Sequence, residues 1–254
     1  MSFSSWLRNF RNKARPASKK ARAVDQQRSD QVWRELAKSD PYWAVLSMPE
    51  YRSGSLTPDA RNIFFESGRQ HIDHVLSKCG QLNPGFSPKS AIDFGCGVGR
   101  LSVALLRREL KVTSIDISSD MLAICRTNCA EVAGSDVRFV ISDDTLSGLT
   151  EKSDLVVSTI TFQHIHPKRG MRIFRRLLEA LNSGGMFSIY FLFGSGAENG
   201  PVGYGSAPIE VEIEMNDYRL KEIIDAVESC CDSCFFEFHR MGNRMGANLY
   251  GRKR

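Results

Sequence analysis

The chain has 254 residues, of which 42% are apolar and 25% charged, which is ordinary for a soluble globular protein. Its longest apolar run, residues 186–193, is far too short for a bilayer span of ~20 residues. The charged N-terminal stretch lacks the apolar core of a secretory signal. We therefore expect a cytoplasmic protein without a membrane-spanning segment.

Positive charge is concentrated at the N-terminus. Residues 1–24 carry seven Lys and Arg and no acid, so subtracting seven from the net charge of +5 leaves −2 for residues 25–254. A slightly acidic body argues against a broad nucleic-acid surface. Apolar side chains of residues 3–14 recur on one helical face: Phe3, Trp6, Leu7, Phe10 and Ala14. An interfacial helix at the inner face of a membrane, a disordered basic tail and a mitochondrial presequence all fit this pattern.

The cysteines favour reduced thiols. Their number, seven, is odd, and they are scattered along the chain, as in a cytosolic protein. Cys231 and Cys234 form a C-x-x-C pair, but a zinc site needs a second ligand pair, and Cys125 and Cys129 have a poorer spacing. We expect no metal site.

The sequence predicts three segments. Residues 1–24 form a basic tail and linker, residues 25–88 a helical extension that caps the core, and residues 89–254 an α/β domain. In the extension, helical spacing predicts one helix around Trp33 and a second from Pro58. Tyr42 and Trp43 are an aromatic pair, either core or part of a cap over a ligand. His71 and His74 are expected at the surface of the second helix.

Residues 90–101 (SAIDFGCGVGRL) organise the α/β domain. An apolar strand ends in an acid, Asp93, and three glycines spaced two apart, and helical spacing follows. Strand, glycine loop and helix are the first βα turn of a nucleotide-binding domain, in which glycines let the backbone approach a ligand. A dinucleotide fingerprint would need glycine at Arg100, whereas the third glycine is Gly99.

Acidic residues recur where the next strands end. A second strand over 111–117 ends at Asp116, and a third over 137–141 is followed by Asp143 and Asp144. A carboxylate at the end of the second strand can accept hydrogen bonds from both ribose hydroxyls of a nucleotide. Acids at three successive strand ends therefore favour a nucleotide site.

A fourth strand over 154–160 is almost wholly apolar, as in a parallel strand that is covered on both faces. It runs into a loop with Thr161, His164 and His166, next to the switch point where ligands bind in such sheets. We expect this loop to face the reactive part of the ligand.

The remaining elements follow in order. The pattern predicts a helix before 182, a fifth strand over 186–193 and a helix over 218–227. Two final strands are predicted over 234–239 and 247–251. The glycine-rich stretch 194–208 is expected to be a long binding loop or lid.

The spacing acid-x-Gly-x-Gly-x-Gly resembles motif I of the class I S-adenosylmethionine (SAM)-dependent methyltransferases. Segments 40–46 (DPYWAVL), 64–69 (FFESGR), 93–100 (DFGCGVGR) and 162–165 (FQHI) are similar to those of a bacterial set within this class. The resemblance covers residues 40–253. It implies a Rossmann-like α/β fold with a seven-stranded, mostly parallel sheet whose seventh strand is antiparallel. The implied cofactor is SAM, with S-adenosylhomocysteine (SAH) as product.

The same resemblance, together with the strand-end acids, gives a set of candidate cofactor-binding residues. The set is Arg69, Asp93, Gly95, Cys96, Gly97, Arg100, Asp116, Ile117, Asp143, Asp144 and Thr161. The resemblance places the acids after the third strand at the adenine. Arg69 is either a partner of the SAM carboxylate or a solvated arginine. Cys96 is expected to line the cofactor pocket without reacting.

His164 is the candidate catalytic base, with His166 as runner-up, because imidazole titrates near neutrality. The competing interpretation is that His164 packs against or caps the next helix. We expect a SAM-dependent methyltransferase for a small-molecule or glycan acceptor, at a hydroxyl. Alternatives are an RNA or protein methyltransferase recruited by the basic tail, a non-catalytic SAM-binding module and, weakest, an NAD oxidoreductase. The sequence gives no oligomeric state.

Overall fold

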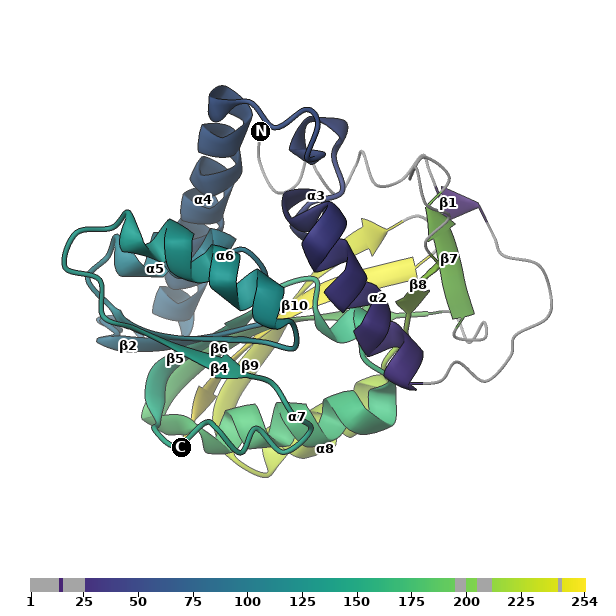
Figure 1. Cartoon of the computed structure of the whole chain (residues 1–254). Helices are drawn as coiled ribbons and strands as arrows, with labels where there is room; N and C mark the ends of the chain where they lie inside the picture. Colours follow the sequence, from purple (N-terminus) through teal and green to yellow (C-terminus); the bar gives the residue numbers. More distant parts are fainter. Residues whose placement is uncertain (1–13, 16–25, 195–199, 205–211, 242–243) are drawn as a thin grey trace.

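A computed structural model describes residues 14–15, 26–194, 200–204, 212–241 and 244–254 (Figure 1). The proposed amphipathic helix lies outside these residues except for Ala14. Ala14 and Arg15 form the short strand β1 (Ala14–Arg15), not helix.

The core is a seven-stranded sheet in the order β4-β3-β2-β5-β6-β10-β9. Its strands are β2 (Ser90–Phe94), β3 (Lys111–Asp116), β4 (Val137–Ile141), β5 (Ser153–Ser158), β6 (Leu181–Phe193), β9 (Cys231–Met241) and β10 (Arg244–Lys253). Neighbouring strands from β4 through β6 pair in parallel, whereas β10 pairs antiparallel with both β6 and β9. Six strands therefore share one direction, and the last strand of the chain is the antiparallel one, as predicted.

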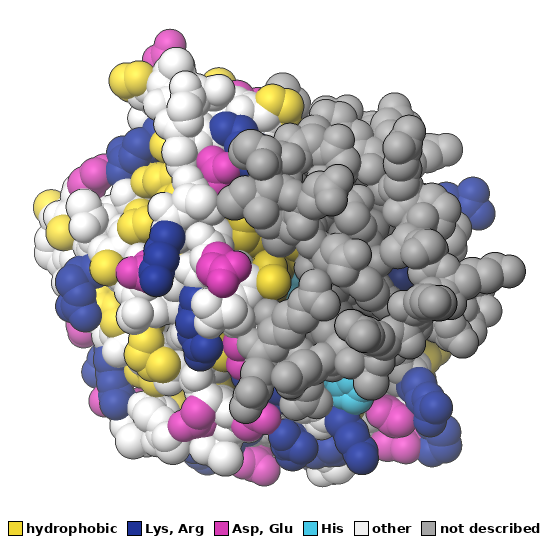
Figure 2. All heavy atoms as spheres, turned by 45° about the vertical axis from the view of Figure 1, so that its right-hand side comes forward, with side chains coloured by type: hydrophobic (Ala, Val, Ile, Leu, Met, Phe, Trp, Pro, Cys, Tyr) yellow, Lys and Arg dark blue, Asp and Glu magenta, His cyan; other side chains and the backbone are white. Residues whose placement is uncertain are grey.

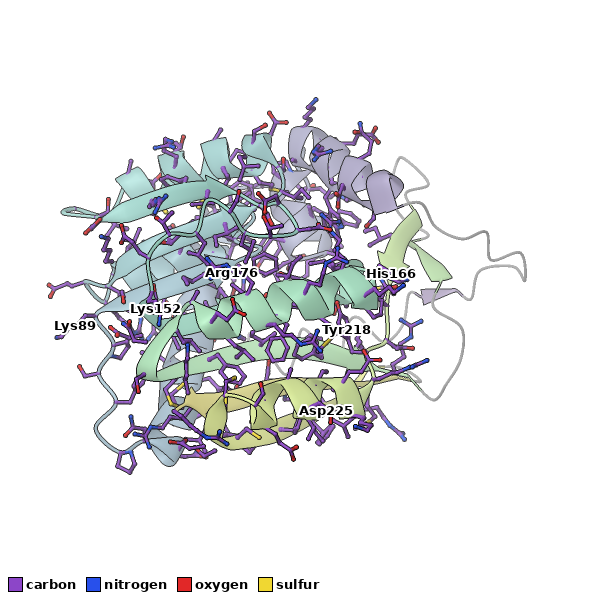
Figure 3. All side chains as sticks on the ribbon, turned by 90° about the horizontal axis from the view of Figure 1, so that it is seen from below. Lys89, Lys152, His166, Arg176, Tyr218 and Asp225 are labelled. Carbon is purple, nitrogen blue, oxygen red and sulfur yellow. The ribbon has the colours of Figure 1, made fainter. Side chains whose placement is uncertain are left out.

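Helices cover both faces of the sheet, and the sheet divides the apolar core into two parts (Figure 1). One face carries α4 (Pro58–Leu82), α5 (Arg100–Leu106) and α6 (Ser119–Ala130), and the other carries α7 (Pro167–Glu179) and α8 (Leu220–Glu228). Figure 3 views the second face, where α7 and α8 lie side by side. The inner strands β2, β3, β5 and β6 are therefore covered on both sides, whereas the edge strand β4 is only partly buried. This cover accounts for the almost continuous apolar sequence of β5.

The extension forms α2 (Gln26–Ser39), α3 (Pro41–Val45), the 3-10 turn η2 (Pro49–Tyr51) and α4. Pro41 separates the first two helices, since proline fits a first turn but not a helix interior. The Asp40 carboxylate at this junction accepts hydrogen bonds from Arg52 Nη1 and the Ser53 backbone N–H, each at 2.7 Å. These contacts fix the end of α2 that is nearest to α3.

Part of the expected long loop after β6 is a strand. β7 (Gly200–Tyr204) pairs antiparallel with both β1 and β8 (Glu212–Met215) in a small separate sheet. The fifth strand also begins earlier than expected, at Leu181, which pairs with Ser153.

Charges are mixed over the described part of the surface in Figure 2, where Lys and Arg side chains lie among Asp and Glu. In the described residues, no helix is both long and apolar enough to cross a membrane.

Candidate active site

The glycine loop turns between β2 and α5 in a backbone conformation that needs glycine. Gly95, Gly97 and Gly99 have φ angles of 74°, 52° and 90°, which side chains disfavour. A Cβ atom at Gly95 would lie 2.2 Å from Thr161 Oγ1, and one at Gly97 would lie 2.5 Å from Val45. The loop is therefore a bare backbone surface between the end of β5 and α3.

A pocket opens at this loop and encloses about 850 Å³ of empty space, part of it open to solvent. Its walls come from five regions: α2 and α3, the ends of β2 and β3 with the residues that follow them, α6, the loops after β4 and β5, and α7. The lining residues are Asp30, Trp33, Ala44, Val45, Phe94, Gly95, Gly97, Asp116, Ile117, Met121, Ser142, Thr159, Ile160, Thr161, His164, Ile165, Arg169 and Ile173.

Asp116 joins the end of β3 to the glycine loop. Its carboxylate accepts hydrogen bonds from the Gly97 and Ser118 backbone N–H groups, each at 2.9 Å. Burial raises the pKa of Asp116 to about 6, although these hydrogen bonds oppose the shift. The carboxylate both holds the loop and borders the pocket, at the position expected for a ribose contact.

Asp93 lies behind the loop and is not among the lining residues. It is 2% exposed and accepts a hydrogen bond of 2.6 Å from Ser102 Oγ, which lies 2.8 Å from Ser114 Oγ. Burial raises the pKa of Asp93 to about 7 against the opposing effect of Ser102. The structure therefore places this acid as an internal brace between β2, α5 and β3.

The two acids after β4 already have partners within the protein. Asp143 is exposed and accepts hydrogen bonds from Thr145 and Ser147, which hold its pKa well below its usual range. Asp144 forms ion pairs with Arg169 and Arg172. Neither acid lines the pocket, whereas their neighbour Ser142 does.

Three other predicted cofactor residues lie away from the pocket. Arg69 is at the surface of α4, paired with Glu66 and Asp73 at 2.6 Å each. Arg100 is 4% exposed, and its Nη1 lies 3.4 Å from Ser67 Oγ of α4. Burial lowers the pKa of Arg100 to about 10. Cys96 is buried within the glycine loop and, contrary to the expectation, does not line the pocket.

The segment after β5 brings Thr159, Ile160, Thr161 and His164 to the pocket. Ile160 has a φ angle of 61°, a strained value for a β-branched residue. Thr159 Oγ1 lies 2.9 Å from Nε2 of His71. The expectation that His71 lies at the surface is wrong, because it is 2% exposed between α4 and the sheet, and this burial lowers its pKa well below the usual value.

His164 ends the 3-10 turn η3 (Phe162–His164). Its ring centroid lies 4.6 Å from that of Trp33, and its Nε2 lies 3.1 Å from Nε2 of the fully buried Gln163. His166, labelled in Figure 3, is the N-cap residue directly before α7 and is not among the lining residues. Of the two histidines, only His164 borders the pocket in the described structure.

Sequence reasoning missed the contribution of α2, α3 and α7 to the pocket. Asp30 and Trp33 are three residues apart and so lie on one face of α2. The aromatic pair suggested as a cap is itself packed inside, since Trp43 is buried and Tyr42 donates a hydrogen bond to Asn128. Val45, from the same short helix, reaches the pocket instead. Helical spacing could have grouped Asp30 with Trp33, but no local signal marks the pocket side.

Comparison with known proteins agrees with this geometry. Residues 91–185 match the family model described as a methyltransferase domain. A carboxy-S-adenosyl-L-methionine synthase from Campylobacter lari is 34% identical over 112 residues, which are 42% of this chain and 47% of that protein. A malonyl-[acyl-carrier protein] O-methyltransferase from Acetivibrio thermocellus is 34% identical over 99 residues, 38% of this chain and 33% of that protein. The chain thus spans less than half the length of these two relatives.

Solved structures show the same fold. Magnesium protoporphyrin IX methyltransferase from Synechocystis PCC 6803, solved with bound SAH, superimposes with a TM-score of 0.62 at 16% identity, covering 91% of this chain and 100% of that one. A 1,6-didemethyltoxoflavin-N1-methyltransferase from Burkholderia thailandensis has a TM-score of 0.57 at 15% identity, covering 95% of this chain and 99% of that one.

The fold is that of the Rossmann-like class I methyltransferases, with the ligand pocket at the switch point of the sheet. Residues 91–185 thus match a methyltransferase domain, in agreement with the class that the glycine loop resembled. In the described residues, no group of three or more His, Cys, Asp or Glu is arranged to hold a metal ion.

Proposed function

We propose that this protein transfers a methyl group from SAM to a hydroxyl of a small-molecule or glycan acceptor. The observation that carries the proposal is the convergence of the glycine loop, Asp116 and His164 on one pocket. A nucleotide cofactor and an acceptor that loses a proton need these groups together.

Two features of the pocket support SAM as the cofactor. The bare backbone at Gly95 and Gly97 permits close approach of the methionine part, and a side chain there would fill the cradle. The Asp116 carboxylate is the partner we propose for the ribose hydroxyls, and Ile117 and Ser142 border the adenine end. SAM, when bound, supplies a methyl group already activated by its sulfonium. The protein therefore contributes mainly positioning.

His164 is the base we propose for the acceptor hydroxyl. The Trp33 ring and the buried Gln163 amide hold its imidazole on two sides, which supports orientation at the pocket. The same contacts would also be present if His164 served only to pack α2 against η3. His164→Gln separates the roles: a base predicts methyl transfer reduced about 100-fold or more with SAM affinity unchanged, whereas a packing role predicts transfer within a few-fold of the wild type.

One relative's name supports an oxygen acceptor, since it describes an O-methyltransferase. The name of another gives a second candidate, the formation of carboxy-SAM. Among the lining residues that the structure describes, Arg169 is the one Lys or Arg, and two carboxylates already engage it. This charge balance disfavours a carboxylate co-substrate and favours a neutral acceptor.

The function is tested by incubating the protein with methyl-labelled SAM and a host lysate, then sorting the label by chemical class. The expected result is label in small molecules, lipid or glycan. Label in RNA or protein would contradict the acceptor class and favour recruitment by the basic tail. Unlabelled fractions with SAM binding intact would favour a non-catalytic binding module. A carboxylated SAM product would favour the second candidate.

A further inference from the structure

A chain of alternating charges ties α2 to α7 and to the loop after β4. Arg169 of α7 lies between two carboxylates, with its Nη1 2.6 Å from Asp30 of α2 and its Nε bonded to Asp144 after β4. Arg172 then pairs with Asp144 at 2.8 Å. The side chain of Arg169 is only 10% exposed, so its pairs are partly shielded from solvent. We call Asp30, Arg169 and Asp144 the clasp.

The contacts of α2 differ between its two ends. Near its start, Ser29 Oγ donates to the His164 carbonyl at 3.1 Å, Asp30 joins the clasp and Trp33 packs on His164. Beyond its other end, Asp40 is fixed by Arg52 and the Ser53 backbone. A helix of this length spans ~20 Å. Its fixed end and its end at the pocket are therefore well separated.

The arrangement of charges makes the clasp releasable on the α2 side. If α2 moves away, Asp30, whose side chain is 22% exposed, passes into water, while Arg169 keeps Asp144 as a partner. If Asp30 were the only carboxylate on Arg169, opening would leave the buried guanidinium without a carboxylate partner, which would cost far more free energy. The second carboxylate thus lowers the cost of opening.

We infer that α2 is a hinged lid over the pocket, and that the clasp sets the rate at which the cofactor enters and leaves. Arg169 and Asp144 are then positioning residues. Asp144 acts through Arg169 and does not touch the adenine, which revises the role implied by the sequence. The choice of cofactor rests on the proposed function, whereas the hinge itself does not.

The two carboxylates have opposite expected effects on exchange. Asp30→Asn removes the contact that closes α2, so SAM association and dissociation both accelerate about tenfold, as for the loss of one charge-assisted hydrogen bond. Their ratio, the Kd, stays nearly constant. Asp144→Asn leaves Asp30 as the one carboxylate on Arg169, so opening becomes harder and both rates fall several-fold.

The test measures SAM association by stopped-flow tryptophan fluorescence, SAM dissociation by a chase with excess SAH, and Kd by equilibrium dialysis of labelled SAM. Glu35→Gln is the matched control, because it removes the same charge from α2 at an exposed site, where the carboxylate accepts a hydrogen bond from Gln31. Asp30→Glu should restore wild-type exchange rates. Thermal unfolding of each variant verifies that it folds.

Hydrogen exchange of the α2 amides, measured without ligand, reports the opening of α2 independently of the cofactor. Asp30→Asn should raise amide exchange in α2 and Asp144→Asn should lower it. Unchanged SAM rates and amide exchange in Asp30→Asn would overturn the clasp. Faster dissociation with a higher Kd in Asp144→Asn would show that this acid is a cofactor contact after all. A wild-type protein that fails to bind SAM would instead overturn the proposed function, with the amide exchange still deciding the hinge.

Discussion

At the scale of single residues, the two acids that flank the glycine loop have different roles. Asp116 borders the pocket and receives two backbone N–H groups, whereas Asp93 is enclosed and receives the Ser102 hydroxyl. Both have pKa values raised by burial. The sequence predicted a cofactor contact for each, but the structure brings only Asp116 to the pocket.

Asp116→Asn should raise the Kd for SAM about tenfold or more. The amide offers one oxygen where the carboxylate offers two, so its NH₂ group must face either the Gly97 or the Ser118 N–H, and a charge-assisted partner for ribose hydroxyls is lost. Equilibrium dialysis with labelled SAM measures the change. Asp120→Asn, the same charge change four residues on and outside the pocket lining, should bind like the wild type. Equal affinity in both variants would remove Asp116 from the site.

Asp93 should make the protein less stable as the pH rises. Its pKa is about 7 in the folded protein and about 3.9 in an unfolded chain, so between these values the folded state binds more protons. Stability therefore falls through this window, by about 2 kcal/mol between pH 5 and pH 7. Urea unfolding of the wild type and of Asp93→Asn at several pH values isolates this contribution. Parallel pH profiles for the two proteins would show that Asp93 is ionised throughout.

At the scale of elements, α4 holds the glycine loop from behind by crossing α5 at very short range. A Cβ atom at Gly68 would lie 2.2 Å from the Arg100 carbonyl oxygen, which is backbone and cannot move aside. Glycine is thus required here by contact, whereas Gly80 of the same helix has nothing within 4 Å of a Cβ position.

Gly68→Ala and Gly80→Ala should shift stability in opposite directions. The first forces α4 away from α5 and should cost about 2–3 kcal/mol of unfolding free energy, as overpacking does. The second should gain about 0.5–1 kcal/mol, since alanine favours the helix and restricts the unfolded chain. Urea denaturation measures both changes. A Gly68→Ala protein as stable as the wild type would show that the two helices are less closely packed than described.

At the scale of the whole molecule, the sequence predicted the sheet well. Apolar runs and strand-end acids marked β2 to β6, and the resemblance supplied the antiparallel last strand. The apolar runs and the acids are local features of the sequence, and the antiparallel last strand is common to the class of methyltransferases that the chain resembles. The sequence also pointed to the glycine loop, Asp116, Thr161 and His164, which line the pocket, because each ends a strand or lies within the segment that follows one.

The rest depends on contacts between distant parts of the chain. Asp30 and Arg169 are 139 positions apart, and nothing around either residue marks the other as a partner. Asp144, which the sequence suggested as a cofactor contact, instead forms an ion pair with Arg169 and so belongs to the clasp. Arg69 shows the converse, because its surface partners Glu66 and Asp73 lie within one helical turn of it. That i, i+3 and i, i+4 pattern is a local signal from which a solvated arginine could have been predicted.

Titration calorimetry shows whether this pocket binds SAM. SAM and NAD are titrated separately into the wild-type protein and into Asp116→Asn. We expect one SAM bound per chain in the wild type, weaker SAM binding in the variant and no heat from NAD. Binding of NAD, or SAM affinity that is the same in both proteins, would contradict this expectation.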